Sequence, residues 1–96
     1  MIATPPDLLK LRREIDRVDS ELVQVLARRQ KIVEQVIAIK ERDGLPAFIP
    51  ERIEEVLDGV SRQAEAAGLS ADLARALWKG MIDWFVAFEE KQLKDS

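Results

Sequence analysis

Two charged residues occupy positions where the sequence pattern predicts apolar side chains, and a third lies near the same helix face as one of them. Between Asp7 and Arg42, apolar residues recur at alternating steps of three and four, and Arg29 takes one position of that stripe. Lys40 follows eleven residues later, which returns to within about 20° of the same helix face. Glu89 follows Phe85 by a step of four, at the end of another apolar row. Charges are costly to bury unless they are paired, so these three are candidates for an ion-pair network or a ligand site.

The residue types present limit the chemistry. The sequence has no Cys, His or Tyr, which excludes a thiol nucleophile, a zinc-thiolate site and an imidazole base. No metal ligand cluster or phosphate loop is recognisable, so we expect neither a metal nor a cofactor. Cations without a nucleophile are typical of a site for a small dicarboxylate. Such a site can also catalyse a reaction that needs only orientation and electrostatic stabilisation.

Each of the three charges also has a structural interpretation. Arg29 could pair with a core-facing acid or reach water at the edge of the stripe, and Lys40 could be a solvated lysine near a helix end. Alternatively, the two bracket one anion. Glu89 could pair with either cation or stay protonated, since burial favours the neutral form and nearby cations favour the carboxylate.

Two further arginines are candidates for the same site. Arg12 lies about 25 Å before Arg29 along a helix axis, so it cannot reach the Arg29–Lys40 region of its own helix. In an antiparallel or crossed pair of helices it could reach the site of a partner chain. Arg52 falls in the first turn of a predicted helix, where a cation opposes the helix dipole, which suggests an anion nearby. The remaining arginines of the long helix are expected on the surface.

Composition indicates one small domain, residues 1–96, with 47% apolar and 34% charged residues. The net charge of −3 argues against a nucleic-acid partner. No apolar run is long enough for a membrane span, and the first residues lack the regions of a signal peptide. We therefore expect a cytoplasmic protein.

The pattern predicts an all-α fold of three helices, one long, one short and one medium. The first begins at Thr4-Pro5-Pro6-Asp7, with Thr4 as the cap and Pro5 at the first helical position, and ends at Arg42 before Gly44. The second runs from Pro50 or Glu51 to a stop at Gly68, and the third, capped by Ser70, covers Ala71 to about Leu93. The first would be a rod of roughly 50 Å, too long to bury its stripe within so small a chain, so a partner chain is expected.

The predicted loop, residues 43–50, is unusually apolar at Leu45, Phe48 and Ile49. The loop could pack over the core or cover a pocket, and the sequence is compatible with both interpretations.

Taken together, these residues resemble the all-helical chorismate mutases over roughly residues 7–92. The resemblance is carried by the following residues of the sequence: Leu8-Leu9-Lys10-Leu11-Arg12-Arg13-Glu14-Ile15-Asp16, Asp19, Leu22, Ala27-Arg28-Arg29, Lys40 and Pro50-Glu51-Arg52. It implies an intertwined homodimer, and the cofactor-free pericyclic isomerisation of chorismate to prephenate in aromatic amino acid biosynthesis by the shikimate pathway.

The resemblance also implies roles for individual residues. Arg12 of one subunit and Arg29 of the other would bind the two substrate carboxylates. Lys40 would hydrogen-bond a carboxylate and the ether oxygen of the breaking bond, and Arg52 would support the carboxylate or the loop. Glu89 stands where many members carry Gln, a donor to the ether oxygen. Glu donates only when protonated, so activity is expected to decline as pH rises.

Two departures point to a sister group, the isochorismate–pyruvate lyases of salicylate synthesis. Ile49 and Ile53 are apolar at positions where many mutases bind the substrate hydroxyl with acidic or polar residues. Phe85 replaces a small polar residue found in some members. Lyase activity is therefore the alternative hypothesis for an enzyme. A non-catalytic helical dimerisation module is the alternative hypothesis for a protein that is not an enzyme.

Replacement of Arg29 by Ala separates a ligand cation from a structural one. If Arg29 binds substrate, the Arg29→Ala protein should lose activity while its free energy of unfolding stays the same or rises. A buried ion-pair partner should instead cost about 3–5 kcal/mol when removed. Urea denaturation and a substrate assay on the same preparation distinguish the two.

Overall fold

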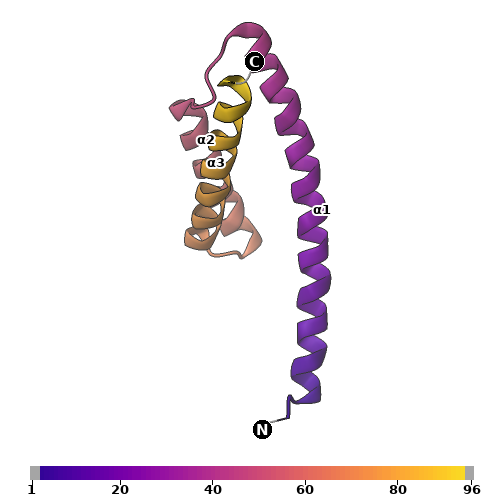
Figure 1. The fold of residues 1–96 in the computed structure, drawn as a ribbon. Helices are drawn as coiled ribbons and strands as arrows, with labels where there is room; N and C mark the ends of the chain where they lie inside the picture. Colours follow the sequence, from indigo (N-terminus) through magenta and orange to yellow (C-terminus); the bar gives the residue numbers. More distant parts are fainter. Residues whose placement is uncertain (1–2, 95–96) are drawn as a thin grey trace. The chain divides into compact units, whose positions relative to one another are not determined.

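The computed structural model describes residues 3–94, and all the regular structure in that range is helical. The helices are α1 (Pro6–Asp43), α2 (Pro50–Ala67) and α3 (Ala71–Lys94), of 38, 18 and 24 residues (Figure 1). The expected all-α class and the long, short and medium order are therefore confirmed. None of these helices combines the length and apolar character needed to cross a membrane in the described residues.

The start of α1 differs from the prediction by one residue. The helix begins at Pro6 rather than Pro5, and the Pro5 carbonyl accepts the Leu9 N–H at 3.1 Å. The Asp7 carboxylate accepts the adjacent Leu8 N–H at 3.0 Å. Either proline suits the first helical position because its missing N–H would have no helical partner there, so the sequence alone could not separate them.

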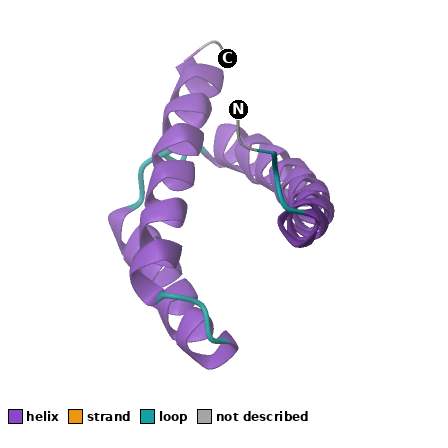
Figure 2. Ribbon diagram, turned by 90° about the horizontal axis from the view of Figure 1, so that it is seen from below, coloured by secondary structure: helices purple, strands orange, loops and turns teal. Residues whose placement is uncertain are grey.

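Glycine and serine end and begin the helices as the sequence predicts. Gly44 and Gly68 have φ values of 68° and 78°, the left-handed conformation that ends a helix at low steric cost. After Gly44 the Leu45 N–H donates to the Lys40 carbonyl at 2.8 Å, and after Gly68 the Leu69 N–H donates to the Ala64 carbonyl at 2.8 Å. The Ser70 hydroxyl accepts the Leu73 N–H at 3.2 Å and so caps α3. In Figure 2 the two connections are drawn in teal, as are residues 3–5 before α1.

The chain divides into two units, one up to Val36 and one from Ile37 onward. Within the first unit, which is the greater part of α1, the predicted apolar stripe is exposed. Its members in this unit are Leu8, Leu11, Ile15, Val18, Leu22, Val25, Ile32 and Val36. A continuous apolar stripe without cover is unusual for a stable helix in water, since most helical stability comes from packing such a face.

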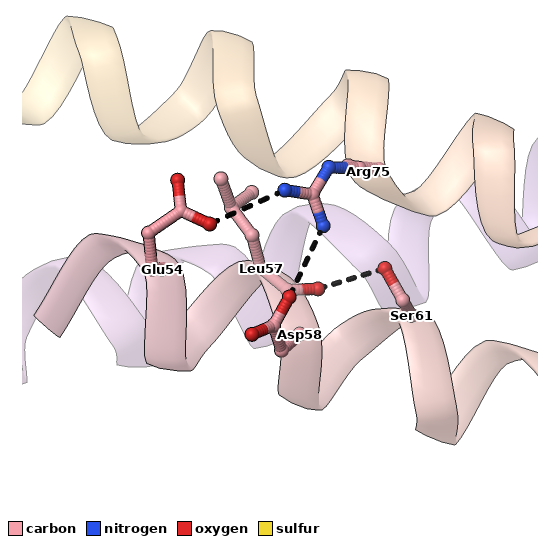
Figure 3. Close-up of polar contacts among 5 residues, drawn as sticks. All are labelled: Glu54, Leu57, Asp58, Ser61 and Arg75. Atoms are coloured by element: carbon pink, nitrogen blue, oxygen red, sulfur yellow. Dashed lines mark hydrogen bonds and ion pairs between the residues drawn. The ribbon is translucent and has the colours of Figure 1, made fainter. Parts of the chain in front are cut away.

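The second unit is built on an α2–α3 hairpin, in which the two helices pack side by side. Its buried side chains come from both helices, from the end of α1 and from the loop after it: Ile37, Ala47, Leu57, Ala64, Ala74, Ile82 and Glu89. Several are alanines, and small side chains allow helix axes to approach closely. The Arg75 guanidinium of α3 donates to Glu54 and Asp58 of α2, both at 3.4 Å (Figure 3). Because these three side chains are exposed, the ion pairs contribute little to the stability of the hairpin.

Candidate active site

A buried ion pair between Lys40 and Glu89 is the centre of the candidate site. The Lys40 ammonium, near the end of α1, donates to Glu89 Oε2 of α3 at 3.1 Å. The two side chains are only 12% and 8% exposed. Lys40 is therefore a partner of Glu89, one of the pairings that the sequence left open. The pair joins residues 49 positions apart in the chain, both within the second unit.

Glu89 is buried because of its place on the row of α3 that faces the hairpin interior. Ala74 and Ile82 on this row are buried, and Trp78 and Phe85 are half-buried. The helical period then places Glu89 on the same face. The sequence prediction that a carboxylate falls on an apolar row is confirmed.

Lys40 has a second partner that the sequence did not reveal. Its ammonium also donates to the backbone carbonyl of Ala47 at 3.1 Å. Ala47 is buried, whereas Leu45 and Phe48 on either side of it are exposed. The apolar loop therefore does not pack on the core as a whole, and it contributes a backbone acceptor to the site. A backbone carbonyl belongs to every residue type, so no sequence signal identifies this contact.

The other candidates of the second unit come from the loop, α2 and α3. Ile49 and Ile53 are half-buried at the start of α2, and the Ile49 carbonyl accepts the Ile53 N–H at 3.2 Å. Phe85 is half-buried and packs edge-on against Trp84, with ring centroids 5.0 Å apart. Arg52 is exposed and forms an ion pair with Glu55, one turn further along α2. Glu55 supplies the negative charge that the position of Arg52 in the first turn suggested.

Arg12 and Arg29 belong to the first unit, so the meeting of these arginines with Lys40 stays a prediction. Arg12 is exposed and Arg29 is half-exposed. The remaining arginines of α1, Arg13, Arg17, Arg28 and Arg42, are exposed as expected.

Arg42 and Asp43 form an exposed pair at the end of α1. The Arg42 guanidinium donates to both carboxylate oxygens of Asp43, at 2.8 and 3.1 Å. This hydrogen bonding lowers the pKa of Asp43 and raises the pKa of Arg42. A carboxyl pKa that is lower in the folded state adds stability above the unfolded value, and this contribution is lost as the pH falls through the folded value.

Residues 11–90 match the family described as chorismate mutase type II. The chain belongs to this family. Among its curated relatives is the isochorismate pyruvate lyase of Pseudomonas aeruginosa, 36% identical over 92 residues, which cover 92% of this chain and 89% of the lyase. The T-protein of Haemophilus influenzae is 47% identical over 66 residues, 69% of this chain. The chorismate mutase of Methanocaldococcus jannaschii is 21% identical over 89 residues, 93% of this chain and 90% of that enzyme.

The lengths of these relatives differ greatly. The matched segment is only 18% of the T-protein of Haemophilus influenzae and 18% of that of Enterobacter agglomerans. The chain therefore spans less than a fifth of the T-proteins that it matches. It spans most of the Pseudomonas lyase and of the Methanocaldococcus mutase.

In this type II family member, the centre of the site can stabilise negative charge on an oxygen atom. An ammonium has three N–H donors, and Glu89 and Ala47 take two of those of Lys40. The third can bind an anion or an oxygen that becomes negative during a reaction. Fixed donors in a site with little water stabilise such charge more strongly than water does, because they need not reorganise.

Removal of one partner of the buried pair should be more damaging than removal of both. Lys40→Met leaves a buried carboxyl group without its cation and should lower the free energy of unfolding by about 3–5 kcal/mol. The double variant Lys40→Met/Glu89→Met replaces the pair by apolar side chains and should recover most of that loss. Urea unfolding of the two variants beside the unmodified protein measures this. A double variant as unstable as Lys40→Met would contradict the assigned pairing.

Proposed function

We propose that the chain is a chorismate mutase, which converts chorismate to prephenate without a cofactor. The observation that carries the proposal is the buried Lys40–Glu89 pair in a chain of the chorismate mutase type II family. The pair supplies a cation and a carboxyl group away from water, with no nucleophile required. This suits a reaction in which the substrate rearranges within itself.

In the proposed reaction the protein forms no bond to the substrate. The ether C–O bond of chorismate breaks while a new C–C bond forms in the same molecule, and negative charge develops on the ether oxygen. The protein holds the compact diaxial conformer, which lowers the entropic part of the barrier. The third N–H of Lys40 hydrogen-bonds the ether oxygen or the adjacent carboxylate and stabilises the developing charge.

Glu89 has two roles in this proposal. As an acceptor it holds the Lys40 ammonium, as the 3.1 Å contact indicates. As a protonated carboxyl group it donates its O–H to the ether oxygen, while its carbonyl oxygen still accepts from Lys40. Only the protonated form fills both roles, so the proposed mechanism makes activity depend on pH.

The substrate carboxylates are assigned to arginines of two chains in a homodimer. Arg29 of one subunit and Arg12 of the other bind one carboxylate each, since an arginine fork matches a carboxylate. Arg52 supports the carboxylate or the loop, and Ile49, Ile53 and Phe85 line the substrate ring. The exposed stripe of α1 supports the dimer, because a partner helix would remove it from water.

The second candidate function is isochorismate–pyruvate lyase. A specific observation favours it: the Pseudomonas lyase matches this chain over 92 residues at 36% identity, and the match covers most of both proteins. The apolar residues Ile49 and Ile53 are compatible with either reaction. The lyase step is also pericyclic and would use the same cations.

A product assay tests the proposal directly. The purified protein is incubated with chorismate or with isochorismate, and the products are separated chromatographically. Prephenate from chorismate, with little salicylate from isochorismate, supports the mutase. Efficient release of salicylate and pyruvate identifies the lyase, and no product from either substrate rejects both.

Replacement of Glu89 by Gln should change the pH profile. In the unmodified protein, kcat/KM should fall as the pH rises, because an ionised carboxylate cannot donate a hydrogen bond. Glu89→Gln keeps a donor at every pH, so its profile should be flat from mildly acidic to mildly alkaline conditions. Matching thermal unfolding curves for the two proteins serve as the control. Two parallel profiles would exclude the donor role of Glu89.

Introduction of a charge into the α1 stripe should dissociate the proposed dimer. Leu22→Lys places an ammonium on the exposed apolar stripe, where a partner helix would have to bury it at high cost. Gln24→Lys adds the same charge at an exposed residue that is not part of the stripe. Sedimentation should show a monomer for the first variant and a dimer for the second. A monomeric unmodified protein at micromolar concentration rejects the homodimer.

A further inference from the structure

The turn after α1 is bonded to Lys40 at two points. The Lys40 backbone carbonyl accepts the Leu45 N–H at 2.8 Å, and the Lys40 ammonium donates to the Ala47 carbonyl at 3.1 Å. The first bond exists because Gly44 adopts the left-handed conformation with φ of 68°. Both the backbone and the side chain of one lysine are therefore tied to the four residues that follow α1.

The position of the Ala47 carbonyl is fixed from both sides. Ala47 itself is 8% exposed, whereas Leu45 and Phe48 are 46% and 54% exposed. Two residues later, the Ile49 carbonyl accepts the N–H groups of Arg52 and Ile53 at 3.1 and 3.2 Å and so starts α2. The acceptor thus lies between two anchored points of the backbone.

From this geometry we infer that Ala47 is a positioning residue, and that the turn Gly44–Ala47 aims the third N–H of Lys40 at the substrate. The inference rests on the proposed function, since it concerns the same ammonium. The N–H bonds of an ammonium are tetrahedral, so two fixed acceptors, Glu89 Oε2 and the Ala47 carbonyl, determine where the third points. With Glu89 alone, the flexible four-carbon stem could still move the ammonium around that one contact.

The direction of the third N–H of Lys40 should affect kcat more than it affects substrate binding. A carboxylate accepts hydrogen bonds over a broad range of directions, so a misdirected ammonium still attracts the substrate. The developing charge on one ether oxygen needs a donor at one place, and a shift of about 1 Å can lower the rate on the order of 100-fold. Loss of the turn should therefore lower kcat and change KM little.

The two left-handed glycines provide a matched pair of variants. A Cβ added at Gly44 or Gly68 meets no atom within 4 Å, and both residues have positive φ. Gly44→Ala and Gly68→Ala thus introduce the same backbone strain without a steric clash. Gly44 closes the turn that holds Lys40, whereas Gly68 ends α2.

The experiment compares kcat, KM and melting temperature of the two variants with the unmodified protein. Similar falls in melting temperature are expected for both. Gly44→Ala should lower kcat by about tenfold or more, with KM within about threefold, while Gly68→Ala should keep kcat. Equal kcat values in the two variants, or losses that only follow the melting temperature, would overturn the inference.

Two further measurements keep the test decisive. If Gly44→Ala does not fold, Ala47→Gly replaces it: this variant keeps the carbonyl but frees the backbone, and an unchanged kcat would overturn the inference.

Nuclear magnetic resonance of the lysine ammonium groups tests the geometry of Lys40 without any substrate. The Lys40 signal, identified by its absence in Lys40→Met, should be protected from exchange in the unmodified protein and in Gly68→Ala but not in Ala47→Gly. If the protein acts on neither substrate the proposed function fails, yet this signal still reports whether the turn holds Lys40.

Discussion

The second unit of the structure depends on a constraint that a buried ammonium imposes. Lys40 is largely removed from water, so acceptors within the protein must replace most of the hydrogen bonds that its ammonium would make to water. Glu89 provides a full negative charge and Ala47 a carbonyl oxygen. To supply them, α1 must end at Asp43, the next residues must turn back, and α3 must present Glu89 on the face that it packs against α2. The helix ends and the loop conformation therefore both serve to place the hydrogen-bond acceptors of Lys40.

Much of this arrangement can be predicted from the sequence because it depends on residues that are close together in the chain. Gly44 and Gly68 end helices since glycine adopts positive φ at low cost, and Ser70 caps α3 through its hydroxyl. Glu89 was identified as a buried charge from spacing alone, because a helix presents residues of one row to one face. These features need information from only a few neighbouring residues, which the sequence contains explicitly.

The parts that escaped prediction depend on distant backbone atoms or on other chains. The sequence offered several partners for Glu89, and its pairing with Lys40 depends on how α3 packs in the folded unit. The Ala47 carbonyl was missed since a backbone acceptor has no sequence signature. Arg52 suggested an anion, but the structure pairs it with Glu55 one turn away. The expected meeting of Arg12 with Arg29 involves two subunits, so a single chain does not test it.

The neutral character of the Lys40–Glu89 pair has a consequence for how an anion finds the protein. While Glu89 is ionised, the ammonium and the carboxylate 3.1 Å apart carry no net charge, so beyond a few ångströms their field is that of a dipole. At a net charge of −3 the chain as a whole repels an anion weakly. In that state, attraction over a Debye length must come from arginines outside the pair. Lys40 would then act on the anion only at contact. The arginines would attract the anion from a distance, and Lys40 would recognise it once it is bound.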